Sequence, residues 1–438
     1  MGDFQTEFTV ILVITLISTI LIIWKLYKSS HADTHLPPTP FRLPVIGHLH
    51  LLAPSAHHAF HKLSMRHGPV FRVFLGSTPC VVVTSPEIAK QVFKVHENVF
   101  SDRPQNSSVD YMTYGGKGFI FAPYGSYFMF IKNITVSQLL NAKAGESVEL
   151  EMLLGRMTNN VISRMVTGNR GSDEEDEAED MMKIMAEVDK LYGRFNLSDH
   201  IWFCKNLDLQ GLRKTAMDIR RRFDVVTERI LKEHEEARKQ NMETEVKDLL
   251  SILLEISEDE SMEIKLTREN IKAFIMDIFL GGTDTAARTI EWALSELINH
   301  PNIMKKALEE IDQVVGKNRL LQESDIPNLP YLQQIVKETL RLHPAGPMTQ
   351  RLAREDCIVG GYRIPAKTTI FINLWSLGRD PTYWESPLEF RPERFEDKQA
   401  DCFTWKAGKY GDLTSVDMEE GIAISLPRAN PLVCVPVA

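Results

Sequence analysis

The first long hydrophobic segment of the chain has no polar face. From Phe8 to Trp24 it reads FTVILVITLISTILIIW, without a charged residue. As a helix with a rise of about 1.5 Å per residue, this segment would cross most of the roughly 30 Å core of a bilayer. A buried helix of a soluble domain is the alternative, but such helices usually carry one polar side. We therefore expect residues 1–28 to form a single-pass membrane anchor.

Charged residues on either side of this segment indicate its orientation. Asp3 and Glu7 precede it, whereas Lys25 and Lys28 follow it. A cleaved signal peptide would instead carry basic residues before its apolar run. Because the positive flank of a membrane helix usually faces the cytosol, we expect the body of the protein there. By analogy with other anchors of this kind, the membrane is expected to be that of the endoplasmic reticulum.

A periodic pattern occupies the middle of the chain. After Thr267, a residue that can cap a helix, apolar side chains recur three and four positions apart. They stand at positions 271, 274, 275, 278 and 279, and the spacing resumes at 290, 293, 294, 297 and 298 before Pro301. Gly281 and Gly282 interrupt the pattern. It predicts a central core helix about 50 Å long, broken where another group can approach its backbone closely.

The other patterns predict shorter elements around this helix. They indicate a β-hairpin at 70–83 with a Gly76–Pro79 turn, helices at Asn302–Val315 and Tyr331–Leu342, and short strands between Cys357 and Phe371. Prolines at 37, 38, 40 and 44 keep the preceding chain extended. We therefore expect a linker and hinge at residues 29–48, followed by one mainly α domain with a minor β sheet at residues 49–438.

Composition and charge narrow the classes of function. Hydrophobic residues make up 43% of the 438 positions, which is enough for a substantial core. The formal net charge is −9, with acids and bases interspersed, and this disfavours nucleic acid as a partner. The five cysteines are widely spaced and form no CxxC pair. This argues against a disulfide scaffold or a zinc ribbon and is typical of a reducing compartment.

Three short motifs stand in order along the second half of the chain. Gly281-Gly-Thr-Asp-Thr285 interrupts the central helix, and Glu338-Thr-Leu-Arg341 places a carboxylate and a guanidinium one turn apart. Phe390-Arg-Pro-Glu-Arg-Phe395 then offers Arg394 as a third charged partner. Each motif alone is weak, because helix surfaces often carry such pairs. The three together in this order are specific.

With these motifs the chain resembles the cytochrome P450 family of haem-thiolate monooxygenases, and specifically its plant microsomal members. The resemblance covers most of the chain, including the proline hinge, Phe100-Ser-Asp-Arg-Pro104, residues 373–381 and the ending at 417–436. It is nearest to flavonoid and triterpenoid hydroxylases. It implies a cytochrome P450 fold and haem b as cofactor. It also implies hydroxylation of an apolar small molecule with dioxygen and with electrons from NADPH, passed on by NADPH–cytochrome P450 reductase.

The resemblance assigns roles to residues of all three motifs. It implies that Glu338, Arg341 and Arg394 form a buried salt-bridge triad, whose loss would leave an unpaired buried charge. It also implies that the central helix opens at Gly281 and Gly282, so that dioxygen and water can lie beside it.

Further residues are expected to act on protons and on the cofactor. By resemblance, Asp284 and Thr285 relay protons. The alternative for Thr285 is a hydroxyl that bonds back to the helix carbonyl one turn earlier. Arg351 matches a position whose side chain binds a haem propionate through a charge-assisted hydrogen bond.

The sequence departs from the family where the iron ligand should stand. In the family a cysteine thiolate binds the iron from a loop of form FxxGxRxCxG, and no such loop occurs in this chain. Cys402 lies seven residues after Phe395, at the spacing of that cysteine. Lys398, Ala400 and Thr404, however, replace the first glycine, the arginine and the last glycine of the loop. Cys402 is therefore only a weak candidate for the metal ligand.

A second departure affects cofactor binding. Where the family places a tryptophan–arginine pair, this chain has Phe128 and Met129, and Lys132 could replace the lost charge from the same helix face. Residues near 142–145 and near 396–402 join stretches that the family keeps apart, which indicates internal deletions. Two hypotheses follow for the chain. It is either a haem-dependent hydroxylase or a catalytically inactive truncated variant, acting as a remnant or a regulator.

Overall fold

The computed structural model describes most of the chain and divides it into two compact units. Unit 1 comprises Met1–Pro104, Leu197–Gln210 and Met348–Leu377, and unit 2 comprises Gln105–Asn196, Gly211–Pro347 and Gly378–Ala438. The described residues are 15, 18–19, 35–53, 55–104, 106–115, 117, 148–167, 175–204, 207–239, 248–261, 265–316, 319, 321–395, 404–407 and 433–437.

Several of the expected features lie outside the described residues. These are the membrane anchor at residues 1–28, apart from three of its positions, Lys132, Cys402, and both expected deletions, near 142–145 and near 396–402. Among the residues that the structure does describe, no helix combines the length and hydrophobicity that a membrane span requires.

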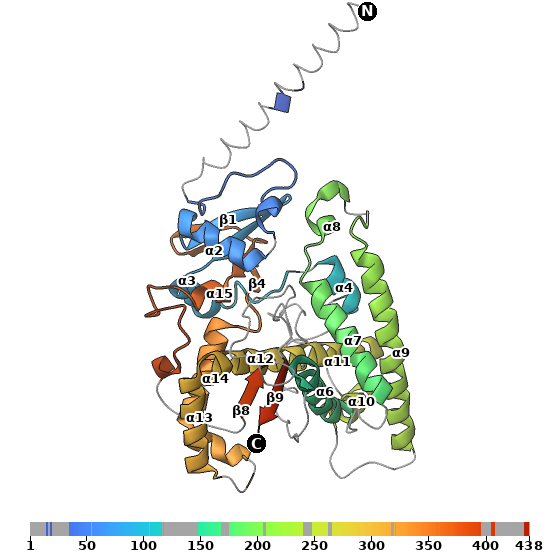
Figure 1. Ribbon diagram of the computed structural model, residues 1–438. Coiled ribbons are helices and arrows are strands. Elements are labelled where there is room, and N and C mark those ends of the chain that lie inside the picture. The colour runs from blue at the N-terminus through green and yellow to red at the C-terminus, as the bar shows by residue number, and fades with distance from the viewer. Residues whose placement is uncertain are drawn as a thin grey trace, which may run out of the picture. The chain divides into compact units, whose positions relative to one another are not determined.

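Unit 1 is built on a four-stranded sheet with strand order β1-β2-β7-β4 (Figure 1). β1 (Val70–Leu75) and β2 (Thr78–Val83) are antiparallel, β7 (Thr369–Ile372) is parallel to β2, and β4 (Thr349–Leu352) is antiparallel to β7. The hairpin expected at 70–83 is confirmed. Its turn is Gly76–Ser77, shorter than the pattern suggested, and Gly76 has the φ of +59° that such a turn needs. Pro79 lies within β2 but precedes Cys80, where the pairing with β7 begins.

Short helices and a hairpin complete unit 1. They are η1 (Leu49–Leu51), α2 (Ala56–His67), α3 (Pro86–Lys90), the π-helical turn η2 (Gln91–Val95), α8 (Leu197–His200), η3 (Trp202–Cys204), β5 (Cys357–Val359) paired with β6 (Tyr362–Ile364), and α15 (Leu374–Leu377). The fully buried Phe60 of α2 packs its ring against Phe71 and Phe371 of the sheet, with ring centroids 6.3 and 5.5 Å apart. Aromatic packing thus fixes α2 on the sheet.

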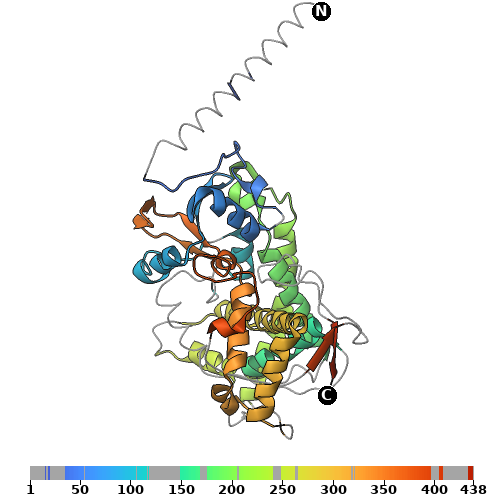
Figure 2. The ribbon, with the colours of Figure 1, turned by 60° about the vertical axis from the view of Figure 1, so that its left-hand side comes forward.

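Unit 2 is mainly helical. Its helices are α4 (Ser107–Met112), α6 (Leu150–Thr167), α7 (Glu175–Tyr192), α9 (Leu212–Lys239), α10 (Leu249–Glu258), α11 (Arg268–Gly282), α12 (Asp284–Asn299), α13 (Pro301–Val314), η4 (Glu323–Asn328), α14 (Pro330–Leu342) and η5 (Pro392–Phe395). α12 contacts α6, α13 and α14 (Figure 2). The fold class predicted from the sequence, mainly α with a minor β sheet, is confirmed.

The central helix follows the predicted pattern with one change. Thr267 is its N-cap, accepting a hydrogen bond from the backbone N–H of Asn270 and forming a capping box with that residue. The helix is interrupted at Thr283, which has φ −82° and ψ −67°, rather than at the two preceding glycines. Pro301 does not only end this helix, because it also occupies the first turn of α13, where its missing N–H costs nothing.

Unit 2 also contains a small antiparallel sheet with strand order β3-β9-β8. β3 (Val148–Glu149) and β8 (Thr404–Ala407) both pair with β9 (Val433–Val437), the last strand of the chain. β3 follows the region near 142–145, and β8 follows the region near 396–402. The sheet therefore joins segments that lie just after both expected deletions.

Candidate functional site

The break in the central helix forms where α6 packs against it. The hydroxyl of Thr158, on α6, lies 3.0 Å from the carbonyl oxygen of Thr283 and can donate a hydrogen bond to it. A Cβ atom at Gly282 would collide with the side chain of Ile162, also on α6. Glycine at position 282 therefore permits the close approach of the two helices, and a larger residue would require the Ile162 side chain to shift. Gly281 precedes it and is exposed.

Thr285 makes the hydrogen bond that was the alternative to a proton relay, a bond back to the helix backbone. Its hydroxyl donates to the carbonyl oxygen of Gly281, one turn earlier, at 2.6 Å. A hydroxyl has one hydrogen to donate and two lone pairs, so this bond leaves the oxygen able to accept a further one. The bond fixes the orientation of Thr285, and its part in a proton relay stays a prediction.

Asp284, the other expected relay residue, belongs to a buried charge network. Nη2 of Arg288 lies 3.3 Å from Oδ2 of Asp284 and 3.3 Å from Oδ2 of Asp189, on α7. The side chains of Arg288 and Asp189 are only 8% and 2% exposed. Sequence reasoning missed both residues. The spacing of four between Asp284 and Arg288 was an available signal, whereas nothing local pointed to Asp189.

The three charged residues of the other two motifs come together in unit 2. The carboxylate of Glu338 is fully buried and accepts hydrogen bonds from Nε and Nη2 of Arg341 at 2.7 and 2.8 Å. Nε of Arg394 donates to the same carboxylate at 3.0 Å. The backbone N–H of Arg391 adds a fourth bond at 2.8 Å. This geometry is that of a buried, fully hydrogen-bonded ion triad.

The remaining guanidinium donors of this triad hold the chain after residue 377. Arg341 donates to the carbonyl oxygens of Gly378, Pro387 and Glu389. Arg394 donates to the carbonyl oxygens of Glu385, Ser386 and Glu389. Each contact joins α14 or η5 to the loop between Gly378 and η5. The triad therefore positions this loop.

Arg351, the expected propionate-binding residue, lies on β4 in unit 1. Its Nη1 donates to Oγ1 of Thr349 at 2.9 Å and to the carbonyl oxygen of Gln350 at 2.8 Å. Its guanidinium lies 5.1 Å from the centroid of the Phe93 ring, on the π-helical turn. Burial and the charge of Arg103 lower the pKa of Arg351 to about 10. Two like charges in a partly desolvated place favour the binding of an anion.

Arg103 is the functional candidate that sequence reasoning missed in unit 1. Burial lowers its pKa as well, an effect that the neighbouring charge of Asp102 opposes. Its Nη1 donates to the carbonyl oxygen of Ser101 at 3.1 Å. Its position in the Phe100–Pro104 motif could have identified it. The resemblance to the cytochrome P450 family includes that motif but assigns no role to its arginine.

These residues fit one part of a haem and not another. The Arg103–Arg351 pair suits a carboxylate such as a propionate. Thiolate ligation requires a cysteine of lowered pKa, but burial raises the pKa of Cys80 to about 12. Burial, with the charges of Asp356 and Glu355, raises that of Cys357 to about 11. Within the described part of the chain, no group of three metal-binding side chains is present. Cys80 and Cys357 thus do not fit an iron ligand.

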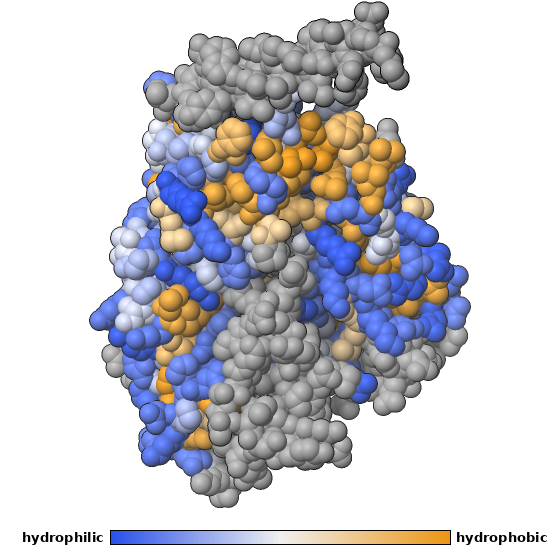
Figure 3. All heavy atoms as spheres, turned by 45° about the horizontal axis from the view of Figure 1, so that its top comes forward, coloured by the Kyte–Doolittle hydropathy of each residue, from blue (hydrophilic) through white to orange (hydrophobic). Residues whose placement is uncertain are grey.

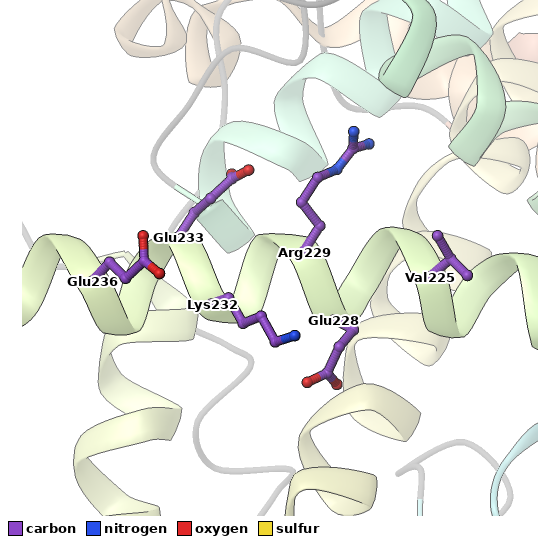
Figure 4. A pocket seen from close by; sticks show the side chains of 6 residues that line it. All are labelled: Val225, Glu228, Arg229, Lys232, Glu233 and Glu236. Atoms are coloured by element: carbon purple, nitrogen blue, oxygen red, sulfur yellow. The ribbon is translucent and has the colours of Figure 1, made fainter.

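A hollow of about 490 Å³ lies along α9 but has no features of a binding site. It is lined by Val225, Glu228, Arg229, Lys232, Glu233 and Glu236, all from this one helix. Figure 4 shows Arg229 and Glu233 pointing to one side of the helix and Glu228 and Lys232 to the other. Glu228 is also ion-paired with Arg268 and Lys272. The lining groups do not converge on a ligand.

Comparison with known proteins gives consistent matches. The family model described as cytochrome P450 matches residues 37–142 and 131–410. The 3,9-dihydroxypterocarpan 6A-monooxygenase of Glycine max is 44% identical, with 98% of this chain and 97% of that one covered. The beta-amyrin 24-hydroxylase of Glycine max is 43% identical, with 86% and 79% covered. A zebra fish cytochrome P450 solved with abiraterone has a TM-score of 0.71 at 22% identity, covering 87% of this chain and 100% of that one.

The alignment with the pterocarpan enzyme is longer than the chain itself. It runs over 499 positions but includes 98% of the 438 residues, about 429, so about 70 positions carry no residue of this chain. The two segments matched by the family model overlap at residues 131–142. The similarity nevertheless extends along almost the entire sequence. The chain belongs to the cytochrome P450 family.

Proposed function

We propose that this protein serves the hydroxylation of an apolar plant metabolite of the flavonoid or triterpenoid type. The observation that carries the proposal is its 44% identity, along 98% of its length, to an enzyme that oxidises a pterocarpan. A second relative hydroxylates beta-amyrin, a triterpenoid. The reaction would consume dioxygen and electrons from NADPH, delivered by a cytochrome P450 reductase. Haem b, when bound, would supply the oxygen chemistry.

The chain's own residues would contribute binding and proton handling. Arg103 and Arg351 would hold carboxylate groups of the cofactor through charge-assisted hydrogen bonds. Asp284 and Thr285 would hold and pass protons at the helix break, Thr285 through its free lone pairs and Asp284 in exchange with its Arg288 partner. Gly281, which is exposed, leaves the backbone accessible at the same place. Glu338, Arg341 and Arg394 would only position the loop that follows them.

A second candidate function is favoured by the missing FxxGxRxCxG loop. Without a thiolate ligand the chain would be a non-catalytic member of the family, retaining the anchor and most of the helical body. About 70 aligned positions without a residue of this chain support it. So do the raised pKa values of Cys80 and Cys357, which disfavour their thiolates.

One experiment separates the two candidates. Membranes that contain the full chain would be reduced, treated with carbon monoxide and examined for the absorption band of a thiolate-ligated haem. The hydroxylase proposal requires this band, and it requires Cys402→Ala to abolish it, because Cys402 is the one cysteine near the expected spacing. Product formation from flavonoid and triterpenoid substrates would be measured in the same membranes with added reductase. A sample with protein but no band supports the non-catalytic candidate.

We also propose that the protein lies at the endoplasmic reticulum membrane with its body in the cytosol. The apolar segment Phe8–Trp24 and its flanking lysines support this. Unit 1 exposes Phe41 and Val45 within the hinge, and Trp202 and Phe203, which are 75% and 52% exposed. Both pairs lie near one turn, because Gly76 donates to the Ile46 carbonyl and Ser77 to that of His200. Apolar side chains gather on the face shown in Figure 3. Resistance of the membrane-bound chain to alkaline carbonate tests the anchor.

A further inference from the structure

We propose that His48 is a pH-dependent lock that holds the proline hinge on the edge of the unit 1 sheet. The lock is closed while the imidazole is neutral and opens when the imidazole binds a proton. It consists of residues 38–48 of the hinge and the strand β1, and all of its contacts lie within unit 1. It does not depend on the proposed reaction.

β1 is an edge strand whose outer backbone groups bond to the hinge. In the strand order β1-β2-β7-β4 it has one neighbour, so alternate residues direct their N–H and C=O groups away from the sheet. The N–H of Arg72 donates to the Pro38 carbonyl oxygen at 2.7 Å. That of Gly76, just after β1, donates to the Ile46 carbonyl oxygen at 3.2 Å. The hinge thus covers the row of groups that an exposed edge would present to other chains.

His48 bonds to both backbone groups of Phe74, which lies between these two residues. Its backbone N–H donates to the Phe74 carbonyl oxygen at 2.7 Å, and the Phe74 N–H donates to its Nδ1 at 2.8 Å. Its Nε2 lies 3.0 Å from the Pro40 carbonyl oxygen. A backbone N–H only donates and a carbonyl oxygen only accepts, so Nδ1 is the bare nitrogen and Nε2 carries the hydrogen. These contacts therefore require a neutral imidazole in one tautomer.

A second proton on this ring would break the arrangement. In the imidazolium both nitrogens donate, so the hydrogen on Nδ1 would face the N–H of Phe74, and that amide would lose its acceptor. His48 is 0% exposed, so the new charge would also be buried. Burial lowers the pKa of His48, and the charges of His50 and Arg42 lower it further, although the hydrogen bond to Pro40 opposes them. The docked hinge therefore disfavours the proton.

The neighbouring elements add mainly positive charge. The imidazole stacks on the ring of Phe74, with centroids 6.1 Å apart. The guanidinium groups of Arg42, in the hinge, and Arg72, in β1, lie 4.4 and 5.3 Å from the centroid of the same ring. α8 brings one acid and one base, Asp199 and His200, to the turn after β1. Protonation would therefore add a third cation to the two that already share this aromatic ring.

The docked hinge is also strained. The N–H of Ile46 donates to the Pro44 carbonyl oxygen at 2.7 Å, and Val45 between them has a φ of +64°. This is the rare γ-turn with positive φ, which is unfavourable for a β-branched residue. Gly47 has a φ of +60°, and a Cβ atom there would collide with two carbonyl oxygens at the same edge. The contacts with β1 hold this strained turn in place, so losing them favours release.

An open lock would lengthen the tether between the N-terminal apolar segment and the sheet. Residues 38–47 could then extend at about 3.3 Å per residue, which adds roughly 30 Å at most. Because a histidine of lowered pKa takes up its proton only at the expense of docking, the hinge is fully docked above the ordinary pKa of about 6.5. Docking weakens as the pH falls below that value, by at most about tenfold per pH unit.

Amide hydrogen exchange, resolved to single residues, tests the proposal. The full chain in membranes would be compared at pH 7.5 and pH 5, after correction for the intrinsic effect of pH on exchange. We expect the protection of the Arg72, Phe74 and Gly76 amides to fall roughly 10- to 30-fold, because the released hinge uncovers them. In His48→Asn the side-chain oxygen can accept at the position of Nδ1 and binds no proton, so protection should change by less than about twofold. Unchanged protection in the wild type, or an equal fall in the variant, would overturn the proposal.

Two controls distinguish the lock from general loosening in acid. His50→Gln removes an exposed histidine two residues away, and the fall in protection at the edge should persist. The amide of Val73, which is paired with Cys80 of β2, should stay protected at pH 5. An equal loss at Val73 would contradict a local lock. If His48→Asn does not fold, exchange of the hydrogen on C2 of the wild-type His48 ring decides. Its titration must lie below pH 6.5 and follow the loss of edge protection, and a titration at or above 6.5 would overturn the proposal.

Discussion

Two groups of arginines in this chain are held in opposite ways. Arg341 and Arg394 share the carboxylate of Glu338, and the backbone carbonyls around them take up their other donors. Arg351 and Arg103 lie close enough for the charge of Arg103 to depress the pKa of Arg351. Among the described residues, no carboxylate is paired with Arg351. The triad is complete within the protein, whereas the arginine pair has positive charge that an anion from outside could neutralise.

This difference distinguishes structural charge, which holds the fold together, from charge that is available to bind a ligand. The triad needs nothing that the chain lacks, since every partner is its own side chain or backbone. It therefore persists although the FxxGxRxCxG loop does not occur in the sequence. The charge of Arg351 is opposed by no described carboxylate, so it can be neutralised by the carboxylate of a ligand. A complete triad is thus evidence for the fold and says little about whether the cofactor can be held.

The largest expected effect comes from removing the shared carboxylate. Glu338→Gln would leave two buried guanidinium groups without their counter-charge, and breaking such a pair costs about 3–5 kcal/mol. We expect a large fall in the unfolding midpoint or loss of soluble folded protein, measured by denaturant unfolding of the full chain. Glu385→Gln is the matched control, because Glu385 pairs with Arg391 at 2.7 Å but is 78% exposed. Such a surface pair contributes at most about 1 kcal/mol. Equal losses in the two variants would contradict the structural role of the triad.

Elements with a local signal were predictable from the sequence. The capping residue Thr267, the helix at 331–342 and the hairpin at 70–83 each follow from residues close together in the chain. The break in the central helix was expected at Gly281–Gly282 but falls at Thr283. Glycine permits a departure from helix geometry without fixing which residue departs. The contact of Thr158 with the Thr283 carbonyl selects that residue here, and no local pattern encodes it.

Long-range pairings were not predictable in the same way. β2 pairs with β7 across nearly 290 residues of sequence, and Arg103 comes close to Arg351 only because the fold brings their segments together. The pairing of Arg288 with Asp189 joins α12 to α7 in the same manner. The triad is the exception, because Arg394 is 56 residues from Glu338 and was still predicted. Spacing indicated the pair Glu338–Arg341, and the order of the family's motifs identified Arg394.

An effect of intermediate size on the unfolding midpoint is expected from an ion pair whose charge depends on pH. Nε2 of His234 lies 3.1 Å from Oδ2 of Asp248. Burial alone would lower the pKa of His234, but the hydrogen bond and charge of Asp248 raise it above 6.5. Burial would likewise raise the pKa of Asp248, yet His234 and Ser251 hold it below 3.8. The stabilisation that His234 contributes is fully present below the pKa that this residue has in the unfolded chain. It is lost as the pH rises through the higher pKa that the residue has in the folded protein. The stabilisation that Asp248 contributes is lost as the pH falls through the lowered pKa of this carboxyl group in the folded protein.

His234→Gln should therefore destabilise the protein more in mild acid than in base. We expect the midpoint difference between wild type and this variant to be roughly 2 °C larger at pH 6 than at pH 8.5. In an Asp248→Asn background the pH dependence of this difference should disappear, because the partner charge is gone. A larger difference at pH 8.5 would reverse the sign of the argument.

The smallest effect on stability, and the largest on binding, is expected from Arg351→Met. Removing one of two like charges should leave the unfolding midpoint unchanged or raise it by about 1–2 °C. Iron-free protoporphyrin IX, which has two propionates and no metal, tests the anion site apart from iron ligation. Loss of a charge-assisted hydrogen bond of about 1.5–3 kcal/mol should weaken its binding roughly 10- to 100-fold, followed by porphyrin fluorescence.

Arg354→Met is the matched control for this variant. Arg354 lies three residues along the chain, is 49% exposed and is ion-paired with Asp102 at 3.6 Å. Its loss should change porphyrin affinity by less than about threefold, because a surface pair contributes at most about 1 kcal/mol. If Arg351→Met destabilised the fold as Glu338→Gln does, Arg351 would be structural charge like the triad. Unchanged stability together with weakened porphyrin binding would show that the chain keeps a charge that only a ligand can neutralise, whether or not an iron ligand remains beside it.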